Sequence, residues 1–269
     1  IGDASGQYIQ NSSFHNTFNK GLTVHGTQNV LVNENVVYEH IGHGYFLEDA
    51  SEFDNVLSNN LAINARASDS LEVAPEPSDF NSVASFWIEN ADNTLIGNHA
   101  AGSEFEGFRF ALQRVNGASA TLGLYDHLAP ETKGPTDFTG NVAHSTFEAG
   151  VFITTQLIRT IQDTQPTAED QQLFDENWGF SDFTAYKGND TFWPRAIGGD
   201  FYDIKLGEND RANRLRLNQT LYDSLIVGRT GNIGTPITAD EIAAGRSLPP
   251  VTGHYVGHVL YDGPAGLVD

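Results

Sequence analysis

The chain has 269 residues, and 35 acidic against 14 basic side chains give it a formal net charge of −21 at pH 7. Such a charge repels nucleic acids and anionic membrane surfaces over the range of the Debye length, so neither is an expected partner. The absence of cysteine excludes disulfides, thiolate nucleophiles and cysteine-bound zinc.

Short apolar runs separated by glycine and asparagine predict many short strands. A repeat appears when Gly21, Gly44, Gly107 and Gly150 share a column, because GLTVHG, GYFLED, GFRFAL and GVFITT then align. The segment SFWIEN from Ser85 fits the same column without the glycine. Where no longer segment intervenes, the interval between successive residues of the column has the length of one coil of a parallel β-helix. This fold is a solenoid in which successive coils pair strand on strand.

Longer gaps in the repeat predict excursions from the solenoid over residues 64–83, 114–137 and 155–182. Short helices are predicted to begin at Thr167 and Thr238 and to end before Gly179 and Gly245. Asparagines at turn positions are expected to cap the bends.

Alternate residues of each strand face opposite sides of the sheet, so the residues that follow the glycine column divide into two sets. The first set is apolar and is expected to fill the core. It comprises Leu22, Val24, Tyr45, Leu47, Phe86, Ile88, Phe108, Phe110, Val151 and Ile153. The second set is expected to face outward, with neighbouring coils about 4.8 Å apart.

Three outward residues on successive coils form a candidate substrate surface: Phe46, Trp87 and Arg109. As an exposed platform, the two rings would stack on sugars and Arg109 would meet a carboxylate or sulfate. The alternative is a satellite apolar cluster covered by an excursion, most plainly the one over residues 64–83.

His25, Glu48 and Glu89 are the candidate catalytic residues, because they follow one another in the next outward column. Adjacent carboxylates raise one another's pKa, and such a pair suits a retaining glycosidase. In a second scheme His25 or a glutamate abstracts a proton from a uronic acid while Arg109 neutralises the carboxylate, as in a lyase. The alternative is a solvated acidic ladder with a histidine partner.

A calcium site is a third possibility for the same coil. Asp49, Glu52 and Asp54, next to Glu48, supply the hard oxygen ligands that Ca²⁺ prefers. Dinucleotide-binding, P-loop, zinc-protease and serine-hydrolase motifs do not occur in the sequence.

Several blocks occur in the same order as in a known family: IGHGYFLEDA, SFWIENADNTLIGNHAAGSEFEGFRF, NVAHSTFEAGVFI, IGGD and LYDGP. The chain thereby resembles the β-helix region of the family of hyaluronan-binding and cell-surface hyaluronidase proteins, with fibrocystin-like proteins as more distant relatives. The resemblance implies an extracellular right-handed parallel β-helix, a link to hyaluronan binding or breakdown, and calcium dependence. It carries over no established catalytic set.

One block departs from the family pattern. Where relatives read approximately His-Gly-Ala-Trp-x-Arg-Gly-Gly-Asp, this chain has TFWPRAIGGD, with Thr191 in the place of the histidine. The match implies that Trp193 and Arg195 take part in binding substrate.

We therefore expect residues 1–269 to form a single all-β domain, one right-handed parallel β-helix that is monomeric and is a piece of a larger protein. The sequence has no apolar run long enough to span a membrane, so no membrane-spanning segment is expected. The acidic, cysteine-free composition favours an extracellular or cell-surface setting, in a bacterium. The leading function is recognition of an extracellular polysaccharide, with cleavage as a possible activity. The alternative is a non-catalytic adhesin or structural module.

Overall fold

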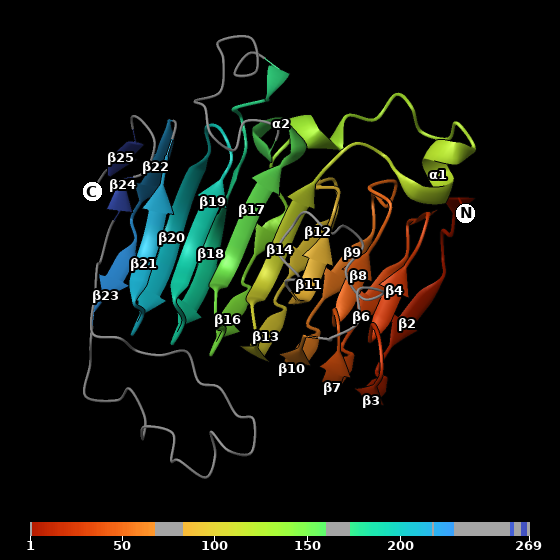
Figure 1. The fold of residues 1–269 in the computed structure, drawn as a ribbon, viewed down its shortest axis with the longest axis horizontal. Helices are drawn as coiled ribbons and strands as arrows, with labels where there is room; N and C mark the ends of the chain where they lie inside the picture. Colours follow the sequence, from red (N-terminus) through yellow and green to blue (C-terminus); the bar gives the residue numbers. More distant parts are fainter. Residues whose placement is uncertain are drawn as a thin grey trace.

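The computed structural model describes residues 2–67, 83–159, 173–216, 218–228, 259–260 and 265–267. The described part is a solenoid of short strands whose coils stack from the N-terminal to the C-terminal end (Figure 1). Every strand pairing in the described part is parallel, as the repeat predicts. The right-handed sense of winding stays a prediction.

An eight-stranded sheet forms one wall of the solenoid in the described residues. Its strands are β4 (Leu22–Val24), β8 (Tyr45–Leu47), β11 (Ala84–Ile88), β14 (Glu106–Leu112), β17 (Ala149–Thr155), β19 (Asp190–Arg195), β21 (Arg211–Leu215) and β24 (Val259–Leu260). Each coil contributes one strand, and we call this wall the front sheet.

The remaining walls belong to a second sheet with 15 described strands, which begins as two rows. One row contains β2 (Tyr8–Gln10), β6 (Leu31–Asn33), β9 (Val56–Ser58), β12 (Thr94–Ile96) and β15 (Phe138–Thr139). The other contains β3 (Ser13–Thr17), β7 (Val36–Ile41), β10 (Leu61–Arg66), β13 (His99–Ser103) and β16 (Val142–His144). Both rows pair with β18 (Gly179–Tyr186), so they merge there into a single wall, the back sheet.

Beyond the merger the back sheet continues through further strands. They are β20 (Asp200–Gly207), β22 (Gln219–Tyr222), β23 (Leu225–Val227) and β25 (Ala265–Leu267). A separate pair, β1 (Gly2–Asp3) with β5 (Thr27–Gln28), lies at the N-terminal end.

Short helices interrupt the coils where excursions are predicted. They are α1 (Gly117–Thr121), the 3₁₀ turn η2 (Pro130–Thr132) and α2 (Gln156–Arg159), and Figure 1 shows α1 and α2 along one edge of the solenoid. The helices predicted from Thr167 and Thr238 lie outside the described residues, as does most of the excursion over 64–83. In the part of the chain that is described, no helix is long and apolar enough to cross a bilayer.

The register between strands confirms the predicted column. Leu22 pairs with Tyr45 on the next coil, and Phe86 pairs with Phe108 in the same way. A Cβ added to Gly107 would lie 2.7 Å from the carbonyl oxygen of Gly150, which explains why this column favours glycine.

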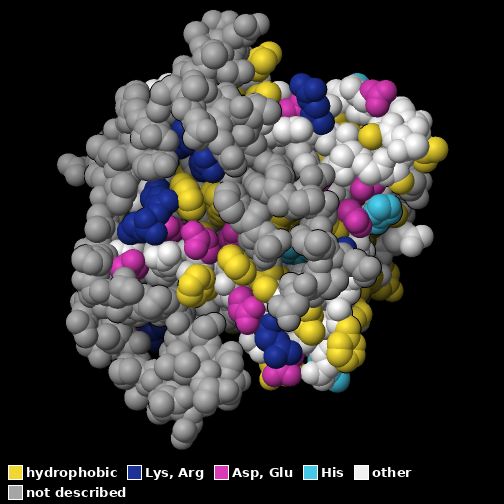
Figure 2. All heavy atoms as spheres, viewed as in Figure 1, with side chains coloured by type: hydrophobic (Ala, Val, Ile, Leu, Met, Phe, Trp, Pro, Cys, Tyr) yellow, Lys and Arg dark blue, Asp and Glu magenta, His cyan; other side chains and the backbone are white. Residues whose placement is uncertain are grey.

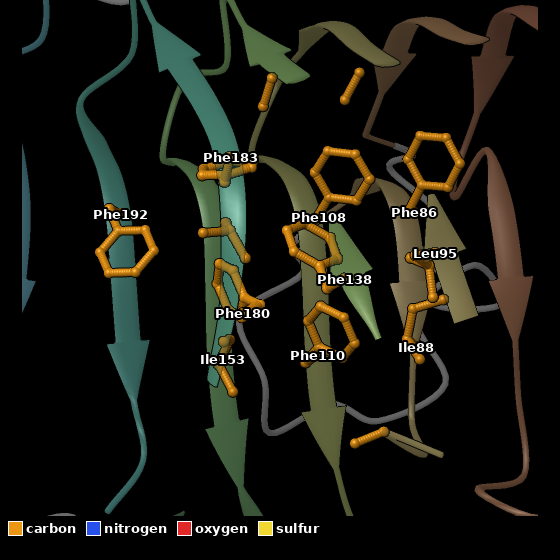
Figure 3. Close-up of a cluster of buried hydrophobic side chains, with 14 of the residues drawn as sticks. Phe86, Ile88, Leu95, Phe108, Phe110, Phe138, Ile153, Phe180, Phe183 and Phe192 are labelled. Carbon is orange, nitrogen blue, oxygen red and sulfur yellow. The ribbon is translucent and has the colours of Figure 1, made fainter. Parts of the chain in front are cut away.

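The predicted inward set forms the core, and all ten of its members are buried. Figure 3 shows Phe108 and Phe110 at its centre, facing Phe138 from the back sheet. The rings of Phe86 and Phe108 stack at 4.7 Å, because residues at the same place on successive coils lie directly above one another.

Buried asparagines cap the bends, as predicted. Asn35, Asn60, Asn98 and Asn141 form a ladder between β-strand rows, and each side-chain oxygen of the last three accepts the backbone N–H of the preceding member at 2.9 to 3.1 Å. The ladder satisfies backbone groups that the turns would otherwise leave buried without partners.

Candidate functional site

One residue from each of the six front-sheet strands from β8 to β21 points away from the core, and these residues form a continuous stack, which we call the outer row. Backbone register aligns its first five members, and Arg214 follows because its neighbour Asn213 pairs with Phe192. The outer row comprises Phe46, Trp87, Arg109, Phe152, Trp193 and Arg214. The predicted alignment of Phe46, Trp87 and Arg109 is thereby confirmed.

The prediction that these three residues form an exposed platform is wrong. Phe46 and Arg109 are 0% exposed and Trp87 is 4% exposed. Phe46 and Trp87 belong to a second apolar cluster, and the ring of His43 packs against both, at 5.0 and 4.4 Å. The burial of these rings removes apolar area from water. It therefore stabilises a second layer of packed side chains on the outward side of the front sheet.

His43 is therefore part of this layer. Its Nδ1 accepts a hydrogen bond from the backbone N–H of Ala84 at 3.2 Å. Burial lowers the pKa of His43 to about 3, so the ring is neutral near pH 7.

Arg109 is held within the outer row. Its guanidinium lies 4.0 Å from the ring centre of Phe152 and 5.6 Å from that of Trp87. The carboxylate of Glu106 approaches it at 4.0 Å. Stacking and an internal carboxylate thus occupy the arginine that was expected to meet a substrate carboxylate.

His25 and Glu48 form an accessible pair at the N-terminal end of the front sheet. His25 Nδ1 lies 3.0 Å from Glu48 Oε2, and the two side chains are 45% and 31% exposed. The buried carboxylate of Asp49 lies 3.8 Å from His25 Nε2. An imidazole between two carboxylates is able to exchange protons with a bound molecule.

Glu89, the third predicted catalytic residue, has a different environment. It is 1% exposed; its Oε1 accepts a hydrogen bond from Trp87 Nε1 at 3.1 Å and its Oε2 accepts one from Asn116 Nδ2 at 3.0 Å. Burial raises the pKa of the Glu89 carboxyl to about 8. Glu48 is hydrogen-bonded to His25, whereas the buried Glu89 is hydrogen-bonded to Asn116, just before α1. The structure therefore does not bring the two glutamates together as an exposed acid and base.

Replacing Glu89 with glutamine should remove part of the pH dependence of stability. The folded chain holds the Glu89 proton more tightly than the unfolded chain, so the wild-type free energy of unfolding should fall as pH rises from 4.5 to about 8. Glutamine does not titrate. The difference in free energy of unfolding between wild type and Glu89→Gln should therefore decline steadily across this window when measured by urea denaturation. A constant difference would contradict a buried, protonated Glu89.

One of the predicted calcium ligands, Glu52, has other partners in the structure. Glu52 is buried, and its two oxygens accept hydrogen bonds from the backbone N–H groups of Gly26 and Asp49. Burial raises the pKa of its carboxyl. Within the described ranges no three histidine, aspartate or glutamate side chains, Asp49, Glu52 and Asp54 included, are grouped so as to hold a metal ion. Glu52 closes a turn, and no step is assigned to calcium.

At the C-terminal end of the front sheet the outer row becomes basic. The ring of Trp193 stacks on Phe152 at 4.3 Å, and the guanidinium of Arg214 lies 4.2 Å from its ring centre. Arg195 follows two residues after Trp193 on β19, and Arg211 begins β21. Figure 2 shows Lys and Arg side chains gathered over this end of the molecule, next to acidic ones. We call Arg195, Arg211 and Arg214 with Trp193 the arginine face.

A buried carboxylate organises two of these arginines. Asp190 is 0% exposed, and its two oxygens lie 2.8 Å from Arg211 Nε and 2.8 Å from Arg214 Nη2. Burial raises the pKa of Asp190 to about 7, and the charge of Arg211 opposes this rise. With Asp190 ionised, two positive charges and one negative charge leave the trio a net positive charge, in a chain whose formal charge is −21.

Two donors on this face have no hydrogen-bond acceptor in the described structure, Trp193 Nε1 and Arg195 Nε. Buried donors normally have a partner, so their orphan state favours a ligand rich in acceptors. Both residues were predicted as binding residues from the family resemblance. Arg211 and Arg214 were missed, although the step from Phe192 to Asn213 continues the repeat and would have placed Arg214 in the outer row.

Parallel coils, a core of stacked rings and an outward row of aromatic and arginine side chains define a parallel β-helix protein. The model of the CEMIP β-helix family matches residues 1–151, more than half of the chain. The chain belongs to this family, as the sequence resemblance indicates.

Individual relatives agree with the family match. Over 97% of its length the chain is 30% identical to the mouse cell migration-inducing and hyaluronan-binding protein, of which it spans 23%. Over 85% of its length it is 27% identical to the cell surface hyaluronidase of Danio rerio, of which it spans 19%. Mouse fibrocystin-L is 31% identical over 54% of the chain, which spans 3% of that protein. These relatives are eukaryotic, so they do not support the predicted bacterial origin.

Proposed function

We propose that this chain is an extracellular β-helix module that binds an anionic polysaccharide of the glycosaminoglycan class, with hyaluronan as the first candidate. The observation that carries the proposal is the arginine face, a cluster of cations at one end of a strongly acidic chain. The names of the relatives, a hyaluronan-binding protein and a cell surface hyaluronidase, support the same ligand class.

The arginines supply the recognition in this proposal. Arg195 and Arg211 are half-buried, with guanidinium groups that match carboxylates in a bidentate manner. Neighbouring coils are about 4.8 Å apart, so cations on β19 and β21 follow one another along the solenoid. A polyanion lying along the front sheet meets them in sequence.

Trp193, predicted as a substrate-binding residue, has a positioning role in this proposal. Phe152 stacks on its ring and the guanidinium of Arg214 lies over the same ring, so little of it is free for a sugar. The ring instead fixes the guanidinium of Arg214. Cation–π contact of this kind restrains an arginine side chain that would otherwise lose entropy on binding.

The salt dependence of hyaluronan binding tests the proposal. Above about 0.15 M salt the repulsion from distant carboxylates is already screened, so further salt mainly weakens contact pairs. The affinity of the full chain for hyaluronan oligosaccharides, measured by isothermal titration calorimetry, should therefore fall between about 0.15 and 1 M NaCl. Absence of binding, or an affinity that rises over this range, would refute an arginine-mediated contact.

Polysaccharide cleavage is a second candidate function, and the exposed His25–Glu48 pair favours it. His25 lies five coils before β19, a distance of roughly 24 Å at the spacing of parallel strands. Arg109 is occupied internally, which leaves the lyase scheme without its predicted partner. New reducing ends or unsaturated products that disappear in Glu48→Gln would support cleavage, and their absence would leave a binding or adhesive module.

A further inference from the structure

The back sheet carries an open groove that is separate from the arginine face. The groove has a volume of about 520 Å³ and lies over β15, β18 and β20. Its lining includes Thr139, Ser181 and Tyr202, which stand in register on these three neighbouring strands. The three strands are neighbours in the sheet, and Figure 1 shows β18 and β20 side by side.

An exposed aromatic pair borders the groove. Tyr202 is 44% exposed, and its ring stacks on that of Tyr222, the next residue along the row, at 4.6 Å and 9°. Tyrosine rings offer a flat apolar face with a hydroxyl at the tip, a combination used where one side of a ligand is apolar and its edge is polar. A pyranose ring has these two surfaces.

The polar groups of the groove are hydroxyls, an amide and carboxylates. Glu176 and Asn177 lie on the chain that leads into β18, and Asp200 begins β20. The described lining includes carboxylates and no lysine or arginine. Carboxylates accept hydrogen bonds from hydroxyl groups, and an amide both accepts and donates them, whereas carboxylates repel a polyanion.

The floor of the groove is kept flat by close backbone approach. A Cβ added to Gly179 would lie 1.9 Å from the carbonyl oxygen of Asp200, and the φ angle of Gly179 is +145°. Trp178, which also lines the groove, is largely buried and donates its Nε1–H to the carbonyl oxygen of Ile197 at 2.8 Å. Close backbone packing and the hydrogen bond of Trp178 thus support the floor of the groove.

We propose that this groove binds an uncharged oligosaccharide, with Tyr202 as the stacking residue and Asp200 and Glu176 as hydrogen-bond acceptors for sugar hydroxyls. The site deepens the polysaccharide role proposed above but occupies the opposite sheet and selects the opposite charge class. A module of this kind holds a neutral glycan at one wall while the arginine face binds a polyanion at another.

Titration of chitotetraose and cellotetraose into the full chain tests this groove. One or both are expected to bind, and Tyr202→Ala should weaken that binding at least tenfold, while Tyr8→Ala, which removes an exposed tyrosine far from the groove, should leave it unchanged. Ser181→Trp, which fills the groove without removing the tyrosine, should also abolish binding.

Failure of this proposal is distinguishable from failure of the function proposed above. If neither neutral tetrasaccharide binds, or if Tyr202→Ala binds them as wild type does, the groove is not a saccharide site, whatever the affinity for hyaluronan. If the neutral probes bind and hyaluronan does not, the groove stands and the arginine face loses its assigned ligand.

Discussion

Replacing Phe108 with alanine is expected to lower the free energy of unfolding by about 3–5 kcal/mol. The side chain is 0% exposed, stacks on Phe86 at 4.7 Å and packs edge-on against Phe138 at 5.1 Å. Its removal leaves a cavity between the front and back sheets, in a region where neighbouring coils on both sides depend on the same stack. Urea denaturation followed by circular dichroism measures the loss.

The matched control is Phe18→Ala, which removes the same ring from a position that is 88% exposed. This variant should change the free energy of unfolding by no more than about 0.5 kcal/mol. A comparable loss in both variants would show that the core described here is not the source of stability.

Removing two charges from the arginine face is expected to weaken hyaluronan binding at least tenfold, which corresponds to about 1.4 kcal/mol or more. In Arg195→Met/Arg211→Met the aliphatic stems remain, so packing on the front sheet is largely kept. Asp190 keeps its contact with Arg214 at 2.8 Å, and it takes up a proton more readily than in the wild type because the charge of Arg211 no longer opposes the effect of burial on its pKa. Calorimetric titration against hyaluronan oligosaccharides measures the effect.

The control for this variant is Arg66→Met/Lys205→Met, which changes the net charge equally at residues of the back sheet. Its affinity for hyaluronan should stay within about twofold of the wild-type value, because surface charges more than a Debye length from a ligand are largely screened. Equal losses in the two double variants would mean that overall charge, and not the arginine face, governs binding.

The fold was predictable from the sequence because each coil repeats the same alternation of core-facing and outward-facing residues. Tyr45, Phe86 and Phe108 recur after the same column and must stack, so register, parallel pairing and the inward set all follow from one alignment. The back sheet was less visible. Its two rows merge at β18, where a single long strand replaces two short ones. The merger depends on the path of the backbone, and no residue pattern marks it in the sequence.

The sequence predicted which residues of the front sheet point away from the core, but it did not predict whether other side chains cover them. Alternation places Phe46 and Trp87 outside the core correctly, yet it carries no information on whether a further layer covers them. Glu89 illustrates the same limit, since its hydrogen bond to Asn116 joins residues far apart in the sequence across an irregular loop. The pair of His25 with Glu48 follows from simple stacking and was predicted.

The arginine face was half predicted. Trp193 and Arg195 came from family resemblance, whereas Arg211 and Arg214 depend on Asp190, whose buried carboxylate holds both side chains. The groove on the back sheet was not predicted, because Thr139 is separated in the sequence from Ser181 and Tyr202 by most of the excursion over residues 155–182. Their neighbourhood is set by strand pairing alone.

Arginine footprinting tests the location of the polyanion most directly. The full chain is labelled with phenylglyoxal in the presence and absence of saturating hyaluronan oligosaccharides, and the modified arginines are quantified by mass spectrometry. Hyaluronan is expected to protect Arg195 and Arg211 and to leave the labelling of Arg66 and Arg114 unchanged. Protection of Arg66 or Arg114 in their place, or no protection at saturation, would contradict binding at the arginine face.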